Sequence, residues 1–526
     1  MYVRVVSGGV LGVDGQIIEV ETDISNGLPL VNVVGLPDPA VRESVERVHA
    51  AVKNCGFSFP LERITVNLAP ADLRKEGTAF DLAIAAGILT ASGQLRAAPF
   101  HGALVIGELA LNGDVRPVPG VLAMVERAKR SGLTRVLLPA GNAGEASLIG
   151  GMELFALRHL GQLSGGCEGG LADWMPLRLA PGEWTGTRAD DTGERTESMS
   201  ESPLDYADVH GQHAAKRAVL TAAAGRHNLL LSGPPGTGKT MLVKRLPGIL
   251  PLLDEQEALE VTKIYSVAGK LGPGRASLLK ERPFRSPHHT ISTGGLIGGG
   301  PVPRPGEVTL AHEGLLFLDE LPEFTRNVLE VLRQPLEDRE VTIARARAVF
   351  RFPARFMLAA SMNPCPCGYA GHETEERRCA CSPNKIASYR GKISGPLLDR
   401  IDLQVDVPRP SLVAGSGSQP SQSTSAMRGM VMAAAERQRA RLALTGAAWN
   451  SDLTGKGLRL ACRLKPDAER LLEEAYRSLG LSLRAHERVL KLARTVADLD
   501  GRDEIAAEHV AEAIQYRCLD RKLEQA

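Results

Sequence analysis

The sequence predicts a multidomain α/β protein built around a nucleotide-binding parallel sheet. Three observations lead to this fold class: a glycine-rich loop between a strand and a helix, alternating strand and helix patterns on both sides of it, and two low-complexity interruptions. A chain of 526 residues is also too long for one hydrophobic core, so we expect about three or four domains.

Composition narrows the class of protein further. The chain is 43% hydrophobic and 23% charged, as soluble globular proteins are, and its formal net charge is +1. Such a balance gives no bulk attraction to nucleic acid or membranes, so binding of either kind requires local patches. The first residues do not read as a signal peptide, and no apolar run reaches the roughly 20 residues that span a bilayer. With eight cysteines in the whole chain, we expect reduced thiols, a cytoplasmic location and no membrane partner.

Residues 1–163 form the first expected domain, an α/β or α+β domain without a metal or phosphate motif. Its β-rich runs are Tyr2–Val6, Gln16–Glu21, Leu30–Val34 and Ile64–Leu68, and its helical runs are Ala40–Asn54 and Phe80–Ser92. Residues 164–203 are rich in Gly, Pro, Thr, Asp and Glu and are interpreted as a linker.

The central domain, residues 204–407, contains the glycine-rich loop GPPGTGKT. The loop matches the phosphate-binding pattern G-x-x-x-x-G-K-[ST], with a short strand at Asn228–Ser232 before it and a helix at Met241–Leu246 behind it. Backbone amides and the helix dipole in this arrangement point at a phosphate chain, which favours a nucleoside triphosphate site over a glycine turn without a ligand. We expect ATP to contact Gly233, Pro234, Pro235, Gly236, Thr237, Gly238, Lys239, Thr240 and Met241.

A second motif supplies a metal ligand and a means of activating water. Leu315–Leu318 predicts a buried strand that ends in two carboxylates. Asp319 would hold a Mg²⁺ ion coordinated by Thr240, and Glu320 would polarise the attacking water. The alternative is an acidic strand end without catalytic meaning, which the preceding phosphate loop disfavours.

Two further residues are ambiguous on composition alone. The strand Arg355–Ser361 leads to Asn363, whose amide could orient water near the γ-phosphate, although Asn before Pro is also a common turn. Arg400 lies in the stretch LLDRID (397–402). It is either an ordinary salt-bridged arginine or a finger that stabilises charge on a neighbouring subunit's nucleotide.

An insertion at residues 364–382 gathers half of the cysteines. Two Cys-x-Cys pairs could place four thiolates around a structural Zn²⁺ ion, although this spacing is tighter than the usual Cys-x₂-Cys. Reduced structural thiols are the alternative. The candidate ligands are Cys365, Cys367, Cys379 and Cys381.

The chain ends with a flexible linker and a helical domain. Residues 408–426 consist mostly of Ser, Gly, Gln and Pro, which is typical of a tether. Residues 427–526 have a helical pattern that is clearest in Asp467–Leu479, Arg484–Leu499 and Ile505–Leu519.

Two basic segments are candidates for DNA contacts. Arg339–Arg355 contains five arginines and alternates like a hairpin, and Arg282–Arg304 contains His288, His289 and a glycine-rich stretch. Positive grooves bind the nucleic-acid backbone without sequence preference. A solvated basic face is the competing interpretation.

Together the motifs resemble those of a known family. From about Asp205 the chain is similar to AAA+ ATPases of the magnesium-chelatase-like group, and over its whole length it resembles the YifB/ComM family. Besides the phosphate loop and the acidic strand, the matching stretches are ITVNLAPAD (64–72), VHGQ (209–212), SPHHT (286–290), GGLIGGG (294–300), MNPCPCGY (362–369), ISGPLLDRIDL (393–403) and ARTVADL (493–499).

The resemblance implies roles for individual residues. Asn363 becomes the sensor-1 residue, Arg400 the arginine finger and Arg484 the sensor-2 arginine on a helical lid, with Arg488 the other candidate for sensor 2. A finger that acts in trans requires a ring, and similar proteins form homo-hexamers whose two basic insertions face the central pore. The residues expected beside the adenine are Val209, Gly211 and Gln212.

The resemblance also implies a Lon-protease-like fold for residues 1–163, with a departure from the active pattern. Ala79 stands where such proteases carry the nucleophilic Ser, and Met124 stands at about the position of the partner Lys. Neither side chain can act as nucleophile or base. The Lon-like domain is therefore expected to be inactive.

The function implied is that of an ATP-driven hexameric DNA motor. By resemblance, its task would be branch migration during natural transformation or recombination, with single-stranded or branched DNA and recombination proteins as partners. One alternative is a chelatase-type remodeller that works on a protein partner, although the chain carries no Asp-x-Ser-x-Ser metal-adhesion site. Another is a non-translocating regulator controlled by ATP.

Overall fold

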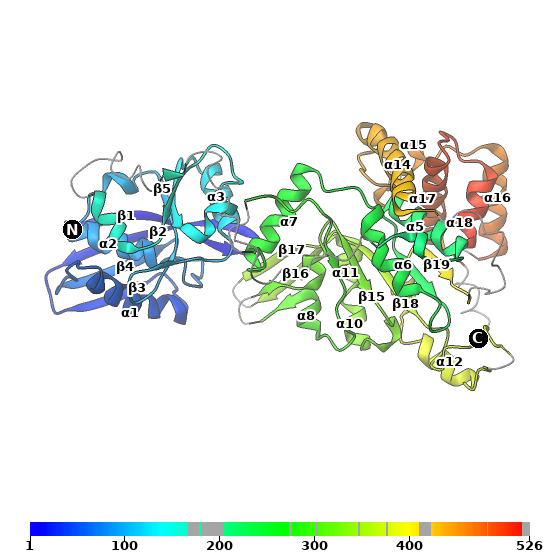
Figure 1. The fold of residues 1–526 in the computed structure, drawn as a ribbon, viewed down its shortest axis with the longest axis horizontal. Helices are drawn as coiled ribbons and strands as arrows, with labels where there is room; N and C mark the ends of the chain where they lie inside the picture. The colour runs from blue at the N-terminus through cyan, green and yellow to red at the C-terminus, as the bar shows by residue number, and fades with distance from the viewer. Residues whose placement is uncertain are drawn as a thin grey trace. The chain divides into compact units, whose positions relative to one another are not determined.

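The computed structural model describes residues 1–166, 178–179, 204–272, 276–300, 303–345, 348–374, 377–409, 422–480 and 482–517. They form two compact units, each with its own hydrophobic core (Figure 1). Unit 1 comprises Met1–Glu194, Glu255–Leu279 and Ala344–Arg351, and unit 2 comprises the remainder. Most of the two expected linkers lies outside the described residues, and the domain boundaries stay a prediction.

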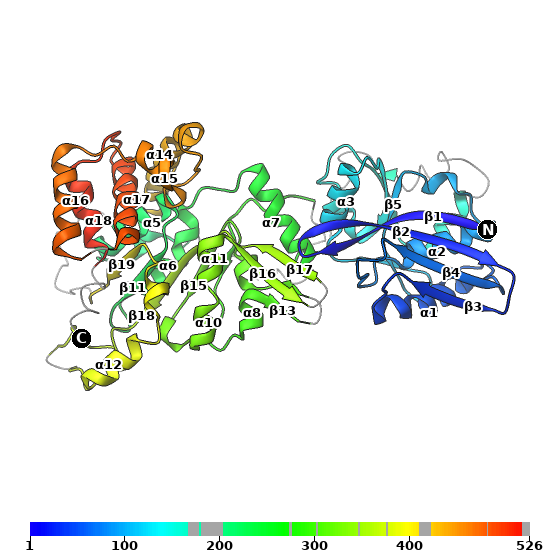
Figure 2. The same cartoon turned by 180° about the vertical axis from the view of Figure 1, so that it is seen from behind.

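Unit 1 contains a mixed eight-stranded sheet in the order β10-β9-β8-β5-β1-β2-β4-β3. The long antiparallel hairpin of β1 and β2 lies near its middle (Figure 2). The four expected strands are confirmed, but β1 and β2 run further than predicted because their antiparallel ladder continues from Tyr2 opposite Asp23 to Leu11 opposite Asp14. The strands are β1 Tyr2–Leu11, β2 Asp14–Ser25, β3 Leu30–Val34, β4 Arg63–Ala69, β5 Ala103–Val105, β8 Arg135–Pro139, β9 Glu153–Leu157 and β10 Arg178–Leu179, with a separate pair β6 Glu108–Leu109 and β7 Val115–Arg116.

The helices of unit 1 pack against this sheet according to their apolar faces. α1 (Pro39–Asn54) begins after Asp38, whose carboxylate accepts a hydrogen bond from the Val41 amide at 2.7 Å and so caps the helix. α2 (Asp81–Ala91) is buried at every position and packs against β1 and β2, as expected for a helix that is apolar all round. Both expected helices are confirmed. α3 (Val121–Arg130) and the short α4 (Ala143–Ala146) follow.

A helix from the middle of the chain completes unit 1. α7 (Glu255–Val267) packs against α3, where Lys263 Nζ lies 3.1 Å from Glu126 Oε2. Ser266 Oγ of α7 also donates to Glu145 Oε2 of α4 at 2.7 Å. Leu259 of α7 packs on a hydrophobic cluster that contains both Ala79 and Met124. Those two positions are thus part of an apolar core, while the likeness to Lon itself stays an expectation.

Unit 2 is built on a parallel five-stranded sheet in the order β12-β15-β18-β11-β19. The register pairs Ser232 with Met362 and Leu318 with Ala360, so the carboxyl ends of β11, β15 and β18 meet at one edge. The predicted parallel sheet is confirmed. Its strands are β11 Leu229–Ser232, β12 Phe284–Arg285, β15 Leu315–Leu318, β18 Met357–Met362 and β19 Leu403–Asp406.

The chain around this sheet also forms short helices and two hairpins, and the second hairpin along the chain includes Ala344–Arg351 of unit 1. The expected arginine-rich hairpin is present as β16 (Glu340–Arg345) and β17 (Ala348–Pro353), and β13 (Gly298–Gly299) pairs with β14 (Arg304–Pro305). The helices are α5 His213–Gly225, α6 Lys239–Arg245, α8 Thr293–Ile297, α9 Glu307–Leu310, α10 Arg326–Glu330, α11 Arg333–Asp338, α12 Pro383–Arg390 and α13 Gly395–Leu398.

The carboxy-terminal region of unit 2 is helical, as predicted. Its helices are α14 Thr424–Thr445, α15 Gly455–Ala461, α16 Pro466–Ser478, α17 Leu483–Leu499 and α18 Ala507–Gln515. Leu492 of α17 and Val431 of α14 lie in the same hydrophobic cluster as Leu229 and Leu231 of the sheet, so helices and sheet share one core. In the part of the chain that is described, no helix is both long and apolar enough to cross a membrane.

Candidate functional site

The phosphate loop connects β11 to α6 in the conformation that its glycines permit. Gly236 and Gly238 have φ of 78° and 88°, in the left-handed region that favours glycine. A Cβ at Gly233 would lie 2.2 Å from the carbonyl oxygen of Val407, the residue after β19, so the two backbone segments pass too closely for a side chain. α6 begins at Lys239, two residues before the predicted start, and its free amides face the loop.

The Lys239 ammonium is folded back onto this loop. It donates hydrogen bonds to the carbonyl oxygens of Gly233 at 2.7 Å and Pro234 at 2.8 Å, and to Asn363 Oδ1 at 3.2 Å. Burial lowers the pKa of Lys239, and the neighbouring carboxylates of Asp319 and Glu320 oppose that shift. The predicted phosphate-binding lysine and sensor asparagine therefore lie in direct contact.

Asp319 lies at the centre of a hydrogen-bonded group. Its Oδ2 accepts from Thr240 Oγ1 at 2.8 Å, and its Oδ1 accepts from the hydroxyl of Ser361 and from the Glu320 amide at 3.1 Å. A hydroxyl and a carboxylate at this spacing are suitable ligands for Mg²⁺. Ser361 was not predicted as a site residue, although a polar residue next to the end of an otherwise apolar strand is a usable signal.

Glu320 occupies an exposed turn beside the phosphate loop. Its φ is 54°, and its side chain is 57% exposed, so its carboxylate is open to water. His289 Nδ1 lies 4.0 Å from Glu320 Oε2, and the His288 and His289 rings lie 4.1 Å apart. From the sequence these histidines were expected in a DNA-binding segment, and the contact between His289 and Glu320 was not predicted.

The residues expected beside the adenine border the same loop. Gln212 Nε2 donates to the Thr237 carbonyl oxygen at 3.3 Å and to that of Pro408 at 2.5 Å. Gly211 and Gln212 have φ of 67° and 56°, whereas Val209 is buried in the core of unit 2. Met241 is 45% exposed.

The predicted finger and the predicted sensor-2 arginine meet at one carboxylate that the sequence analysis missed. Arg400 forms an ion pair with Glu337 of α11 and donates to the Pro396 carbonyl oxygen at 2.6 Å, and Arg484 lies 3.9 Å from Glu337. The side chain of Arg484 is 67% exposed. A charged residue on a helix surface is ordinary, so Glu337 gave no signal in the sequence.

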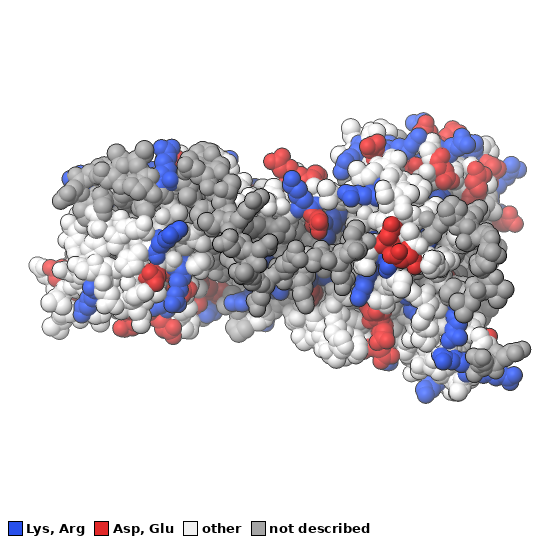
Figure 3. Space-filling view, in the orientation of Figure 1, with Lys and Arg blue, Asp and Glu red and all other residues white. Residues whose placement is uncertain are grey.

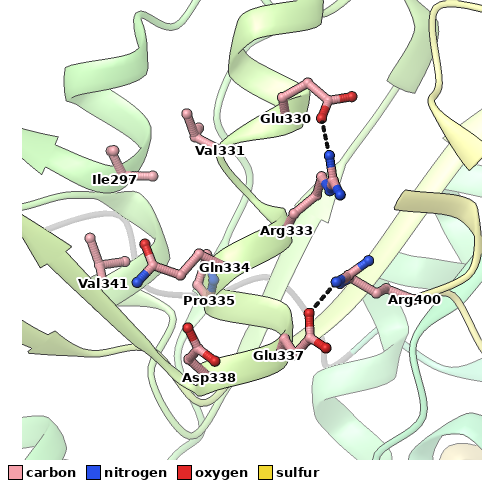
Figure 4. Close-up of a pocket in the computed structure, with 10 residues that line it drawn as sticks. All are labelled: Ile297, Glu330, Val331, Arg333, Gln334, Pro335, Glu337, Asp338, Val341 and Arg400. Carbon is pink, nitrogen blue, oxygen red and sulfur yellow. Dashed lines mark hydrogen bonds and ion pairs between the residues drawn. The ribbon is translucent and has the colours of Figure 1, made fainter. Parts of the chain in front are cut away.

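A groove runs beside this ion pair. Its volume is about 430 Å³, and Figure 4 shows Arg400 and Glu337 at one end of it and Ile297 and Val341 at the other. Arg333 pairs with Glu330 along the same wall at 2.9 Å. The two ion pairs, Arg333 with Glu330 and Arg400 with Glu337, thus give this groove a polar surface.

Arg488, the other sensor-2 candidate, is engaged inside unit 2. Its guanidinium lies 2.6 Å from Asp402 Oδ1. Burial alone would raise the pKa of Asp402, but Arg488 and His227 hold it well below its ordinary range. Asp402 Oδ2 in turn accepts from the Asn228 amide at 3.0 Å, just before β11.

The four cysteines of the insertion converge. Their sulfur atoms lie within 4.8 Å of one another, with Cys365–Cys367, Cys367–Cys379 and Cys365–Cys379 separations of 3.3, 3.5 and 3.7 Å. Cys365 is buried and the other three are partly exposed. Figure 3 shows Lys and Arg side chains gathered over the neighbouring α12.

Several arginines expected to contact DNA are instead held by acids of unit 2. Arg339 and Arg355 both form ion pairs with Asp452, and Arg355 also lies 3.3 Å from Glu313. In the other segment, Arg285 forms a bidentate ion pair with Glu307 at 2.6 and 2.8 Å.

Arg282 is likewise a structural residue of unit 2. It is buried and donates to the carbonyl oxygens of Pro251 and Glu313, each at 2.7 Å. Composition could not distinguish these bound arginines from exposed ones. Arg345 and Arg351 are exposed, and Arg347 lies outside the described residues.

A parallel sheet whose phosphate loop, acidic strand and polar strand end converge, followed by a helical region, defines a P-loop protein of the AAA+ class. Comparison with protein families agrees. Residues 205–414 match the family described as magnesium chelatase, subunit ChlI, and residues 421–517 match its C-terminal family. Residues 20–142 match a further family, subunit ChlI of Mg-chelatase.

Individual relatives are similar over nearly the whole chain. Competence protein ComM of Haemophilus influenzae is 43% identical over 521 residues, which cover 98% of this chain and 97% of the relative. The protein YifB of Escherichia coli is 42% identical over 516 residues, with 98% and 96% covered. The chain belongs to the YifB/ComM family of magnesium-chelatase-like proteins.

Similarity to a magnesium chelatase itself is more limited. The magnesium-chelatase 38 kDa subunit of Rhodobacter capsulatus is 28% identical over 177 residues, which cover 30% of this chain and 50% of that subunit. The resemblance expected from the motifs is thereby confirmed at the level of the family.

Proposed function

We propose that this protein is a cytoplasmic, ATP-driven motor that acts on DNA as a homo-hexameric ring and promotes branch migration in natural transformation or recombination. The observation that carries the proposal is the convergence of Lys239, Asn363 and the Thr240–Asp319 pair in one site. Full-length similarity to a competence protein supports DNA as the object of this activity.

ATP and Mg²⁺ use follows from the family, and the site residues fit both. When bound, Mg²⁺ would neutralise phosphate charge and orient the leaving group. Thr240 and Asp319 would hold the ion, and Lys239 would turn from the Gly233 and Pro234 carbonyls to the phosphates. Asn363, which already accepts from Lys239, would then be free to contact the γ-phosphate or the attacking water.

Glu320 would act as the general base of hydrolysis. Its exposed carboxylate can polarise a water molecule, and its backbone amide is anchored on Asp319 at 3.1 Å.

Arg400 and Arg484 would complete the site from different directions. Arg400 would reach the nucleotide of a neighbouring subunit, and Arg484 that of its own chain. The exposure of Arg484 and the engagement of Arg488 with Asp402 favour Arg484 as sensor 2. Nucleotide state would thereby be linked to rotation between subunits.

DNA contact would come from the tip of the β16–β17 hairpin. Arg345 at the end of β16 and Arg351 within β17 are exposed, whereas Arg339 and Arg355 at the base of the hairpin are bound by Asp452. Positive side chains at such a tip would bind phosphates irrespective of sequence.

We also propose a structural zinc ion at the cysteine cluster. Zinc with bonds of about 2.3 Å to four sulfurs in a tetrahedron requires S–S separations of about 3.8 Å. The separations among Cys365, Cys367 and Cys379 are 3.3 to 3.7 Å, and all four sulfurs lie within 4.8 Å of one another, which is close to this value.

The decisive experiment measures ATP hydrolysis with and without DNA, together with branch migration on three- and four-strand junctions. DNA should stimulate ATP hydrolysis, and the branch point of the junctions should move only when ATP is present. Lys239→Ala should abolish both activities. Stimulation by a protein partner but never by DNA would favour the chelatase-type alternative, which the partial similarity to a magnesium-chelatase subunit keeps in view. ATP binding without either stimulation would favour a regulator.

A further inference from the structure

The cysteine cluster begins directly after β18, the strand that leads to the proposed sensor residue Asn363. β18 ends at Met362, Asn363 follows, and Cys365 comes two residues later. The carbonyl oxygen of Pro364, between Asn363 and Cys365, accepts a hydrogen bond from Arg390 Nε of α12 at 3.0 Å. The residue that would sense the γ-phosphate is thus held on its carboxyl side by the cluster and by α12.

The segment from Met362 to Gly368 also contacts the phosphate loop. Gly368 has φ of 88°, and a Cβ built on it would lie 2.6 Å from Pro235 Cδ. On the other side, the Gly233 amide donates to the Met362 carbonyl oxygen at 3.2 Å. The segment between Cys367 and Cys379 therefore starts against the loop that receives the phosphates.

The described contacts of the segment between Cys367 and Cys379 are mostly at its surface, where His372 Nε2 lies 3.0 Å from Asp406 Oδ1 and Arg377 donates to the Tyr369 hydroxyl at 2.7 Å. The segment is polar, and of its described residues between Cys367 and Cys379 only Gly368 is buried. A bound metal would add a constraint on the inner side of the segment, because a metal site formed by folding contributes its binding free energy to the local structure.

We propose that zinc held by Cys365, Cys367, Cys379 and Cys381 fixes Asn363 and Pro235, so that metal occupancy sets the affinity of the phosphate loop for nucleotide. This inference rests on the zinc site and the ATP site proposed above. It adds that the metal acts on nucleotide binding rather than on the fold of the insertion alone.

Two glycines allow the contact to be tested without touching the cysteines. Gly368→Ala would press a methyl group on Pro235, whereas Gly371→Ala adds the same group at φ of 77° with nothing within 4 Å. Both variants carry similar backbone strain. They differ in the contact with the phosphate loop.

The experiment measures zinc per chain by elemental analysis and the binding of a fluorescent ATP analogue in the full-length protein. We expect one zinc per chain in the wild type, Gly368→Ala and Gly371→Ala, with about tenfold weaker nucleotide binding, or about 1.4 kcal/mol, in Gly368→Ala alone. The variant C379S/C381S should lose zinc and nucleotide affinity together, while Cys55→Ser, in unit 1, should change neither.

The outcomes separate the two parts of the inference. Wild-type protein without zinc under reducing, chelator-free purification would overturn the metal site and the coupling. Zinc-loaded Gly368→Ala that binds nucleotide as Gly371→Ala does would overturn the coupling and leave the metal site standing. Failure of the wild type to bind the ATP analogue would instead reject the proposed nucleotide site.

Discussion

Arg400 and Glu337 form an ion pair at the rim of a groove in unit 2. Glu337 also lies 3.9 Å from Arg484, so the two arginines proposed to reach nucleotides share one acidic partner within a single chain. A triphosphate carries more negative charge than one carboxylate and binds guanidinium groups more strongly. We infer that Glu337 holds both arginines until nucleotide and a neighbouring subunit compete for them.

Replacement of Arg400 by Ala should abolish hydrolysis but spare ATP binding. Fingers of this kind contribute about 10³-fold or more to turnover, because they stabilise charge that develops only in the transition state. Mixing Arg400→Ala with Lys239→Ala chains should restore part of the activity, since some interfaces would combine an intact Lys239 with an intact Arg400. Steady-state ATPase assays of mixed and unmixed proteins provide the measurement.

A matched control for mixing uses two defects on the same side of the interface. Glu320→Gln mixed with Lys239→Ala should stay inactive, because every interface would then contain one damaged phosphate site. Recovery in this control, or none with Arg400→Ala, would contradict a site shared between subunits.

The Glu320→Gln variant should bind ATP normally and hydrolyse it about 10² to 10⁴ times more slowly. The amide preserves the size of the side chain but cannot take a proton from water. Binding is measured with a fluorescent analogue and turnover by phosphate release. Equal loss of binding and turnover would assign Glu320 to nucleotide positioning instead.

Replacing Arg345 and Arg347 by Ala should weaken DNA binding and leave basal ATP binding intact. If each arginine contacts one phosphate, the slope of log affinity against log salt should fall by about 1.4 to 1.8. The comparison is Arg470→Ala with Arg477→Ala, which removes the same charge from exposed positions of α16. Equal effects from the two pairs would indicate general electrostatics rather than a hairpin contact.

Glu313→Gln should destabilise unit 2 at neutral pH by about 3 kcal/mol, because Arg226 and Arg282 would lose a buried partner. Burial alone would raise the pKa of Glu313, but Arg226 and Arg355 lower it from 4.5 to about 2. The stabilisation is therefore complete above about pH 4.5 and disappears as the pH falls toward 2.

Trp449 offers a local probe of this unfolding, since the guanidinium groups of Arg226 and Arg282 lie 5.5 and 5.7 Å from its ring. Its fluorescence can be isolated by changing Trp174 and Trp184 to Phe. The free energies of unfolding of wild type and Glu313→Gln should differ at pH 7 and become equal as the pH falls toward 2. The variant Glu473→Gln, at an exposed position, should have the stability of the wild type at every pH. A difference in free energy of unfolding between wild type and Glu313→Gln that stays constant from pH 7 to pH 2 would refute the prediction.

The sequence predicted the nucleotide-binding sheet well because its signals are local. One apolar strand is followed by GPPGTGKT, and another is followed by Asp319 and Glu320. Each pattern indicates a strand with polar residues at its carboxyl end, and the parallel register brings these ends together. The neighbours of Glu337, Ser361 and His289 depend on contacts between distant segments, which no periodicity encodes. For the same reason Arg339 and Arg355 could not be recognised as partners of Asp452 from a count of charges.

The return of α7 to unit 1 has a consequence for synthesis on the ribosome. The amino-terminal sheet emerges first, yet Leu259, which packs on its hydrophobic cluster, is made only after the phosphate loop. Until then the surface around α3 that receives α7 is open to water. The nascent amino-terminal unit should thus stay incompletely protected while β11 and α6 are being translated, and a chain cut between the two regions would expose an apolar face to chaperones.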